Sequence, residues 1–312
     1  MKSRIQLLDA MRGIAIVSVV LGHTILRDIT NAREEWYLVY IYTFHMALFM
    51  FLGGYLSQGK MGFGWLFKRA WMLLVPFFVW QAIRYYSWID FDGTLWENLW
   101  KAAKYPQNGL WFLYLLFTCS LVLFVCRGKW WLMLIALILI NQVDAPHFQY
   151  VGIRATAWWF IFVGAGYLVA KHKDWFVGDT KWLFRIGLVV YPILFALTWD
   201  YNELKFPAFT NGDMMFSTYR MIMAFLGILW AFSLAHVLLK IKYFGRLTCW
   251  LGTLTLGIYV SHWVFIKFGF GDGYVSALSA AFMSLFGSAI MVYLISKIPV
   301  ARNILLGSTK TI

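Results

Sequence analysis

Charged residues and cysteines are scarce in this sequence of 312 residues. Only 13% of the residues are Asp, Glu, Lys or Arg, whereas soluble globular proteins carry about 25%, which argues against a soluble fold. Cys119, Cys126 and Cys249 all lie inside apolar runs. They offer neither a disulfide framework nor the spacing of a metal site, so no metal is expected. Long Pro, Gly or Ser tracts and internal repeats are also missing, so nothing divides the chain into several domains.

Long apolar runs take up most of the sequence. Hydrophobic residues make up 62% of it, and repeated runs of about twenty residues match the roughly 30 Å hydrocarbon core of a bilayer. The pattern predicts an all-α bundle of about ten transmembrane helices in a single membrane-embedded domain over residues 1–312, with no soluble extension. The predicted spans are 5–26, 36–57, 70–89, 110–126, 130–143, 156–170, 182–199, 218–239, 247–266 and 275–298.

The basic residues are concentrated in alternate loops between these spans. One set of loops contains Lys2, Arg4, Lys60, Lys68, Arg69, Arg127, Lys129, Lys171, Lys173, Lys181, Arg185, Lys240, Lys242, Arg246, Lys297, Arg302 and Lys310. The opposite set contains Arg27, Arg33, Lys101, Lys104, Arg154, Lys205 and Lys267. By the positive-inside rule, both termini are expected in the cytoplasm. Topology therefore accounts for the net charge of +13, and no nucleic-acid partner is expected.

Residues 94–104, between the third and fourth spans, have a different pattern. Leu95, Trp96, Leu99 and Trp100 recur at helical spacing. Charged residues take the opposite face. The pattern predicts a short amphipathic helix in the outer membrane interface.

The first predicted span carries three ionisable residues, Asp9, Arg12 and His23. At 100° per residue, the step from Arg12 to His23 leaves the two about 20° apart on one helix face and about 16 Å apart along the axis. Asp9 falls on the same face and can pair with Arg12. An Arg near the cytoplasmic end suits the phosphates of an acyl-CoA, and a neutral His deeper in the membrane suits a general base. A structural ion pair beside a satisfied His fits the spacing equally well.

Two further histidines lie inside predicted spans. His45 belongs to the second span, near mid-depth, and His262 to the outer half of the ninth. Both can border one cavity with His23, and either can instead be a structural histidine bonded to the backbone. Gly53 and Gly54 in the second span predict close packing against another helix.

The segment 4–16 followed by His23 resembles the opening of the acyltransferase-3 family of integral-membrane O-acyltransferases. The family's spacing of an Arg, ten residues and a His falls here on Arg12 and His23. Residues 44–56 are similar to the family's phenylalanine-rich segment, particularly in its fucose 4-O-acetylase-like branch, although Gly53 replaces the usual Ser and Ala47 stands where Pro is common. Other matching segments are Lys68-Arg69 before Pro76-Phe77-Phe78, Trp111-Phe112-Leu113 and Ser261-His262.

The resemblance implies an enzyme that moves an acetyl group from cytoplasmic acetyl-CoA to a hydroxyl of a cell-surface glycan or its lipid-linked precursor, in the bacterial cytoplasmic (inner) membrane. It implies that the donor's phosphates meet Arg12, Lys68 and Arg69. His23 would be the general base, with Asp9 either taking part in catalysis or orienting Arg12. The acceptor would approach from outside and contact the residues His45, Trp111 and His262.

Three alternatives stay open at the level of the sequence. A transporter or flippase also lines its pathway with intramembrane Arg and His residues, although no inverted repeat is evident here. A membrane scaffold would use the same buried groups only to order its helices. An acyltransferase that uses succinyl or another acyl donor would share every feature described above.

Overall fold

The computed structural model describes residues 2–59, 61–87, 93–106, 110–143, 150–172, 181–198 and 214–308. Within these ranges every regular element is helical, which confirms the all-α prediction. The contacts divide the chain into two compact units. The first comprises Met1–Phe49, Asp174–Leu294 and Ile312, and the second comprises Met50–Lys173 and Ile295–Thr311.

Several described helices are long and apolar enough to cross a membrane, so the chain is a multi-pass membrane protein. Six pass this test in the described ranges: Gln6–Asp28, Trp36–Tyr55, Phe63–Ser87, Ile153–Lys171, Ser217–Lys240 and Gly273–Lys297. A bent pair, Lys242–Thr253 with Thr255–Phe268, would make a seventh. Trp111–Val125, Trp130–Asn141 and Ile186–Thr198 are shorter apolar helices. The total of about ten spans and the cytoplasmic termini therefore stay predictions.

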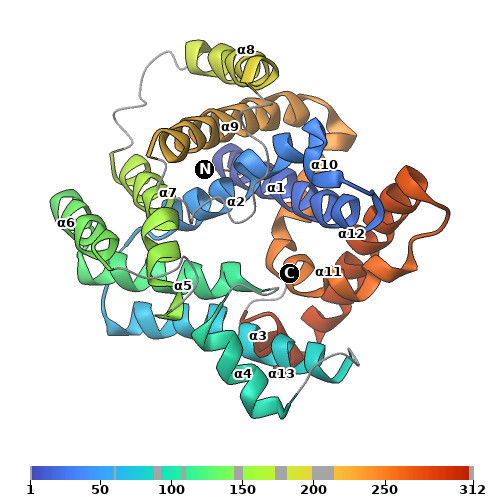
Figure 1. The fold of residues 1–312 in the computed structure, drawn as a ribbon, viewed down its shortest axis with the longest axis horizontal. Coiled ribbons are helices and arrows are strands. Elements are labelled where there is room, and N and C mark those ends of the chain that lie inside the picture. Colours follow the sequence, from blue (N-terminus) through green and yellow to red (C-terminus); the bar gives the residue numbers. More distant parts are fainter. Residues whose placement is uncertain are drawn as a thin grey trace. The chain divides into compact units, whose positions relative to one another are not determined.

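In the first unit, α1 packs against several other helices and α8 packs on α9 (Figure 1). The helices of this unit are α1 (Lys2–Asp28), most of α2 (Trp36–Tyr55), α8 (Lys181–Thr198), α9 (Met214–Lys240), α10 (Lys242–Thr253), α11 (Thr255–Phe265) and most of α12 (Gly273–Lys297), with short 3-10 helices at Ala32–Glu34 and Ile266–Phe268. The partners of α1 include α9, α10 and α11. It is completely or almost completely buried at Ala10, Ala15, Ile16 and Val20, because small and branched apolar residues suit an interior helix.

Glycines bring the backbones of α1 and α10 into direct contact. A Cβ atom added at Gly252 would lie 1.8 Å from the carbonyl oxygen of Asp9, and one added at Gly13 would lie 2.0 Å from that of Thr248. No larger residue fits at either position without moving a helix. The contact also places α10 directly beside the turn of α1 that carries Asp9.

The predicted ninth span, 247–266, contains a sharp bend. The chain bends by 87° between α10 and α11, and Leu254 lies at the break with non-helical dihedral angles. Thr255 Oγ1 donates to the Gly252 carbonyl at 2.7 Å, and Thr253 Oγ1 donates to the Trp250 carbonyl at 2.7 Å. These hydroxyls satisfy carbonyls at the end of α10. The sequence does not reveal the break, because residues 247–266 contain no Asp, Glu, Lys or Arg on either side of it.

The second unit is built from helices that pack pairwise. They are the end of α2, α3 (Phe63–Ser87), α4 (Leu95–Lys104), α5 (Trp111–Val125), α6 (Trp130–Asn141), α7 (Ile153–Lys171) and α13 (Pro299–Leu305), with a short 3-10 helix at Tyr150–Gly152. α5 packs on α3 and α7, and α6 packs on α7. A Cβ atom at Gly54 would lie 1.9 Å from the Val163 carbonyl oxygen, and one at Gly166 would lie 2.0 Å from that of Phe51. The predicted close packing at the Gly53-Gly54 pair is therefore confirmed.

The amphipathic segment forms the predicted short helix, α4. Thr94 caps its start, because the Glu97 backbone N–H donates to the Thr94 hydroxyl and the Thr94 backbone N–H donates to the Glu97 carboxylate. This reciprocal pair satisfies two N–H groups that a helix start leaves unpaired. Trp96 and Trp100 are exposed, as expected of a helix that rests in an interface.

Candidate active site

Asp9 and Arg12 form the predicted ion pair on α1. Arg12 Nη1 donates to Asp9 Oδ1 at 3.0 Å, and both side chains are partly buried. Because α1 is continuous from Lys2 to Asp28, the helical spacing holds between Arg12 and His23. They share one face, separated by about 16 Å along the axis.

His23 contacts His262, a residue 239 positions away in the sequence. Its Nδ1 lies 2.8 Å from Nε2 of His262, and the ring centroids are 5.0 Å apart. The second nitrogen of His262, Nδ1, lies 2.8 Å from the Tyr259 carbonyl oxygen and 3.2 Å from that of Ile258. His262 is almost completely buried. His262 therefore lies directly beside His23, while its predicted contact with the acceptor stays a prediction.

The break at Leu254 explains how His262 reaches this position. α11 is an independent helix of 11 residues that packs on α1. His262 lies in its last turn. The sequence identified His262 as a candidate, but its bond to His23 depends on packing between helices that no local pattern encodes.

His45 has a different environment on α2. Its Nδ1 donates to the carbonyl oxygen of Ile41, one turn earlier, at 2.7 Å. Its ring and that of Tyr42 pack nearly perpendicular to each other, with centroids 4.8 Å apart, and the side chain is buried. This is the bonding of a structural histidine. Its predicted contact with the acceptor stays a prediction.

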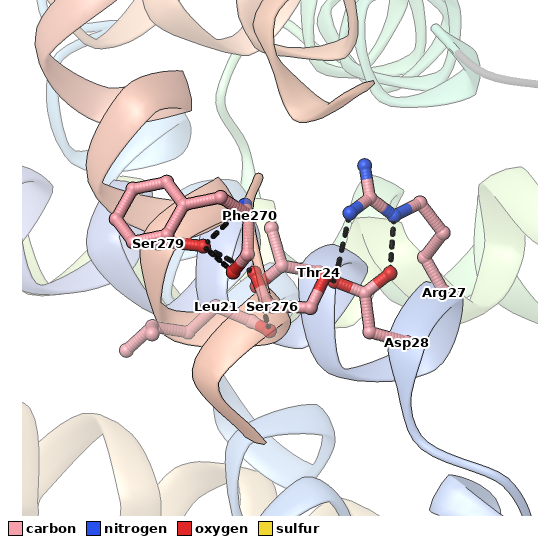
Figure 2. Close-up of polar contacts among 7 residues, drawn as sticks. All are labelled: Leu21, Thr24, Arg27, Asp28, Phe270, Ser276 and Ser279. Carbon is pink, nitrogen blue, oxygen red and sulfur yellow. Dashed lines mark hydrogen bonds and ion pairs between the residues drawn. The ribbon is translucent and has the colours of Figure 1, made fainter. Parts of the chain in front are cut away.

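A polar network holds the end of α1 beyond His23 (Figure 2). Arg27 pairs with Asp28 through both its Nε and its Nη2 atoms. Ser276, at the start of α12, donates to Asp28 Oδ2 at 2.9 Å. Ser279 Oγ closes the neighbouring turn by accepting from the Phe270 N–H and donating to its carbonyl, each at 2.9 Å. The network joins α1 to α12, and sequence reasoning missed it because single Ser and Asp residues at span ends carry no pattern.

The remaining candidates, Lys68, Arg69 and Trp111, belong to the second unit. Arg69 donates to the Ser57 hydroxyl and to the Gly53 carbonyl, and its guanidinium lies 5.5 Å from the centroid of the Trp65 ring. Lys68 is exposed. The Trp111 ring lies 5.3 Å from that of Trp159. Their roles in binding donor and acceptor stay predictions.

Comparison with known proteins decides the family. The family model described as an acyltransferase domain matches residues 5–297, nearly the whole chain. The chain belongs to the acyltransferase-3 family. Part of this acyltransferase is also similar to the nodulation protein NolL of Sinorhizobium fredii (strain NBRC 101917 / NGR234), with 38% identity over 86 residues. That match covers 24% of the acyltransferase and spans only 23% of the relative's length. No solved structure matches this acyltransferase.

The residues on α1 and α11 can support acyl transfer. A paired Arg can bind an anionic donor, and a histidine bonded to a second histidine can accept a proton. Family membership favours this chemistry over the transporter and scaffold alternatives.

Proposed function

We propose that this membrane acyltransferase is an O-acetyltransferase of the bacterial cytoplasmic membrane. It moves an acetyl group from cytoplasmic acetyl-CoA to a hydroxyl of a cell-surface glycan or of its lipid-linked precursor. The observation that carries the proposal is the bond from His23 to His262, on the face of α1 that also holds the Asp9–Arg12 pair.

The donor site follows from Arg12. Its planar fork of N–H groups matches phosphate oxygens, and Asp9 already holds the side chain in place. The spacing of about 16 Å to His23 suits an extended phosphopantetheine arm that carries the acetyl group from the phosphates to the base. Lys68 and Arg69 are further candidates for the phosphates.

In the chemical step the acetyl group moves from a thioester, acetyl-CoA, to an oxygen ester on the acceptor. His23 takes the proton of the acceptor hydroxyl while its oxygen attacks the thioester carbonyl carbon. The carbon–sulfur bond then breaks, and the departing CoA thiolate receives that proton from His23. The products are the O-acetylated acceptor and free CoA, so atoms and charge balance without a metal or a redox partner.

Release of free CoA by the purified protein in nanodiscs tests the proposal. The substrates are acetyl-CoA with a panel of free and lipid-linked oligosaccharides, and succinyl-CoA is a parallel donor. We expect release that depends on an acceptor and falls by a factor of about 10² or more in His23→Ala, as for loss of a general base. Arg12→Ala should instead raise the KM for acetyl-CoA.

His236→Ala is the matched control. His236 lies on α9 and its Nδ1 is 2.9 Å from the carbonyl oxygen of Phe232 in its own helix, so it reports the general effect of losing a partly buried helix histidine. Equal loss of activity in the His236 and His23 variants would contradict a catalytic role for His23. Transfer from succinyl-CoA alone would replace the acetyl assignment, and release with neither donor would contradict the proposed function.

A further inference from the structure

We propose that His262 is a positioning residue that sets the tautomer of His23 and then shares the proton that His23 removes from the acceptor. The proposal rests on the proposed function. It is carried by the direct bond between the two rings and by the backbone carbonyls around His262.

The carbonyls assign the hydrogen on His262. Its Nδ1 lies within hydrogen-bonding distance of the carbonyl oxygens of Tyr259 and Ile258, at 2.8 and 3.2 Å. A carbonyl oxygen can only accept, so Nδ1 of His262 carries a hydrogen and donates it. In a neutral imidazole the other nitrogen, Nε2, is then an acceptor.

The position of the hydrogen on His23 follows from this acceptor. Nδ1 of His23 lies 2.8 Å from His262 Nε2, so Nδ1 of His23 is the donor in this bond. A neutral His23 then has no hydrogen on Nε2, and Nε2 is its basic nitrogen. Without His262 the ring can adopt either tautomer, and one of the two has no basic nitrogen at Nε2. His262 therefore decides which atom of His23 acts as the base.

The same bond can spread the charge that forms during the reaction. When His23 Nε2 takes the acceptor's proton, the hydrogen on His23 Nδ1 can move across to His262 Nε2. His262 then holds hydrogens on both nitrogens, and His23 remains neutral with its hydrogen on Nε2. His262 lies in the last turn of α11, where the helix dipole and the nearby carbonyls favour a positive charge. The break at Leu254 makes α11 a separate helix and so directs this C-terminal end toward α1.

Close packing between helices holds the rings of His23 and His262 at bonding distance. A Cβ atom at Gly257 on α11 would lie 2.5 Å from the Val292 side chain on α12, and one at Gly287 on α12 would lie 2.6 Å from Phe265. α11 and α12 are therefore closely packed, while the network of Asp28 and Ser276 joins α12 to α1 (Figure 2). His45 and His236 also bond their Nδ1 to a carbonyl of their own helix. His262 differs in that its second nitrogen bonds His23.

Nitrogen-15 NMR of the histidine rings tests the tautomers without any need for turnover. The full-length protein with labelled histidine in nanodiscs is compared with His262→Leu, which removes the acceptor, and His262→Gln, whose amide oxygen can replace it. We expect His23 to carry its hydrogen on Nδ1 in the parent and in His262→Gln, and to shift toward the Nε2-protonated form in His262→Leu. Resonances of His45 and His236 report whether each variant is folded.

Turnover separates positioning from proton sharing. In the acetyl-CoA assay, His262→Leu should lower kcat by a factor of about 10². The kcat of His262→Gln should be roughly tenfold higher than that of His262→Leu, because the Gln variant restores the tautomer but cannot take the proton. The KM for acetyl-CoA should stay within about threefold in both variants, since Arg12 is unchanged. Ser261→Ala is the control, because Ser261 donates only within α11, to the Gly257 carbonyl at 2.7 Å.

Three results would overturn the proposal. One is a parent protein in which His23 carries its hydrogen on Nε2. The second is an unchanged tautomer and kcat in His262→Leu, and the third is an equal loss of kcat in the Leu and Gln variants. If His262→Leu does not fold, the spectrum of the parent protein and the results for His262→Gln still test the proposal. A parent that shows the assigned tautomers but releases no CoA would contradict the proposed function and not the tautomer assignment.

Discussion

At the scale of single residues, position along α1 separates the tasks of Asp9 and His23. Asp9 lies about 21 Å from His23 along the helix axis, at 1.5 Å per residue. Its observed partner is Arg12, at 3.0 Å. The pair also lowers the cost of keeping an Arg in a transmembrane helix, which would be several kcal/mol for an unpaired charge. These facts favour Asp9 as the residue that orients Arg12 over Asp9 as a group at the reacting atoms.

Replacement of Asp9 distinguishes the two roles. We expect Asp9→Ala to raise the KM for acetyl-CoA about tenfold, which corresponds to about 1.4 kcal/mol of donor binding. The kcat should change by less than about threefold, because the donor, once bound, still reaches His23. Steady-state kinetics of purified Asp9→Ala and Asp9→Asn would measure both constants. A fall in kcat of about 10² with an unchanged KM would instead make Asp9 catalytic.

At the scale of the helices, the contact between α1 and α10 depends on two glycines. Since the nearest atom to a Cβ at Gly252 is a backbone oxygen of Asp9, at 1.8 Å, a side chain there cannot be accommodated by a rotamer change. The two helices must move apart. Because this contact lies at the turn that carries Asp9, movement of α10 should also disturb Arg12.

Alanine at Gly252 therefore has two expected effects. It should lower the free energy of unfolding by about 1–3 kcal/mol, as overpacking does, and it should raise the KM for acetyl-CoA. Gly64→Ala is the matched control, since Gly64 lies in α3 with nothing within 4 Å of an added Cβ, and alanine there should stabilise by up to about 1 kcal/mol. Thermal unfolding in detergent measures the change in stability, and steady-state kinetics measure the KM for acetyl-CoA. A Gly252→Ala protein as stable as the Gly64→Ala protein would contradict the contact.

At the scale of the whole molecule, the charge of alternate loops predicts its orientation. α2 is apolar over Trp36–Tyr55 and long enough to cross the membrane, so the chain segments before and after it should lie on opposite sides. The predicted topology puts Thr30 outside and Gly62 in the cytoplasm. The acceptor would then meet the outer end of α1 near Arg27, and the donor would enter at its Arg12 end.

Cysteine labelling in intact cells checks this orientation. The native Cys119, Cys126 and Cys249 are replaced by alanine, and Thr30→Cys or Gly62→Cys is added to that background. A maleimide that cannot cross membranes should label Thr30→Cys in intact cells and Gly62→Cys only after permeabilisation. The reverse pattern would place the termini outside the cytoplasm, and labelling of both from one side would show that α2 does not span the membrane.

Much of the fold was predictable because its signals are local. Apolar runs of about twenty residues identify membrane helices wherever they occur, since the bilayer imposes the length. The capping pair of α4 and its two-sided pattern likewise lie within a few residues. The bend at Leu254 within the predicted ninth span was not predictable in this way, because residues 247–266 contain no Asp, Glu, Lys or Arg that would mark a break.

The sequence by itself determined the membrane class, the acyltransferase family and the common face of Asp9, Arg12 and His23. A single helix has a constant rise and rotation per residue, so its spacing converts directly into geometry. Only the tertiary structure decided that His262 bonds His23, that α10 turns sharply into α11 and that glycines join α1 to α10. These features depend on residues far apart in the chain, and only the packing of side chains between helices brings them together.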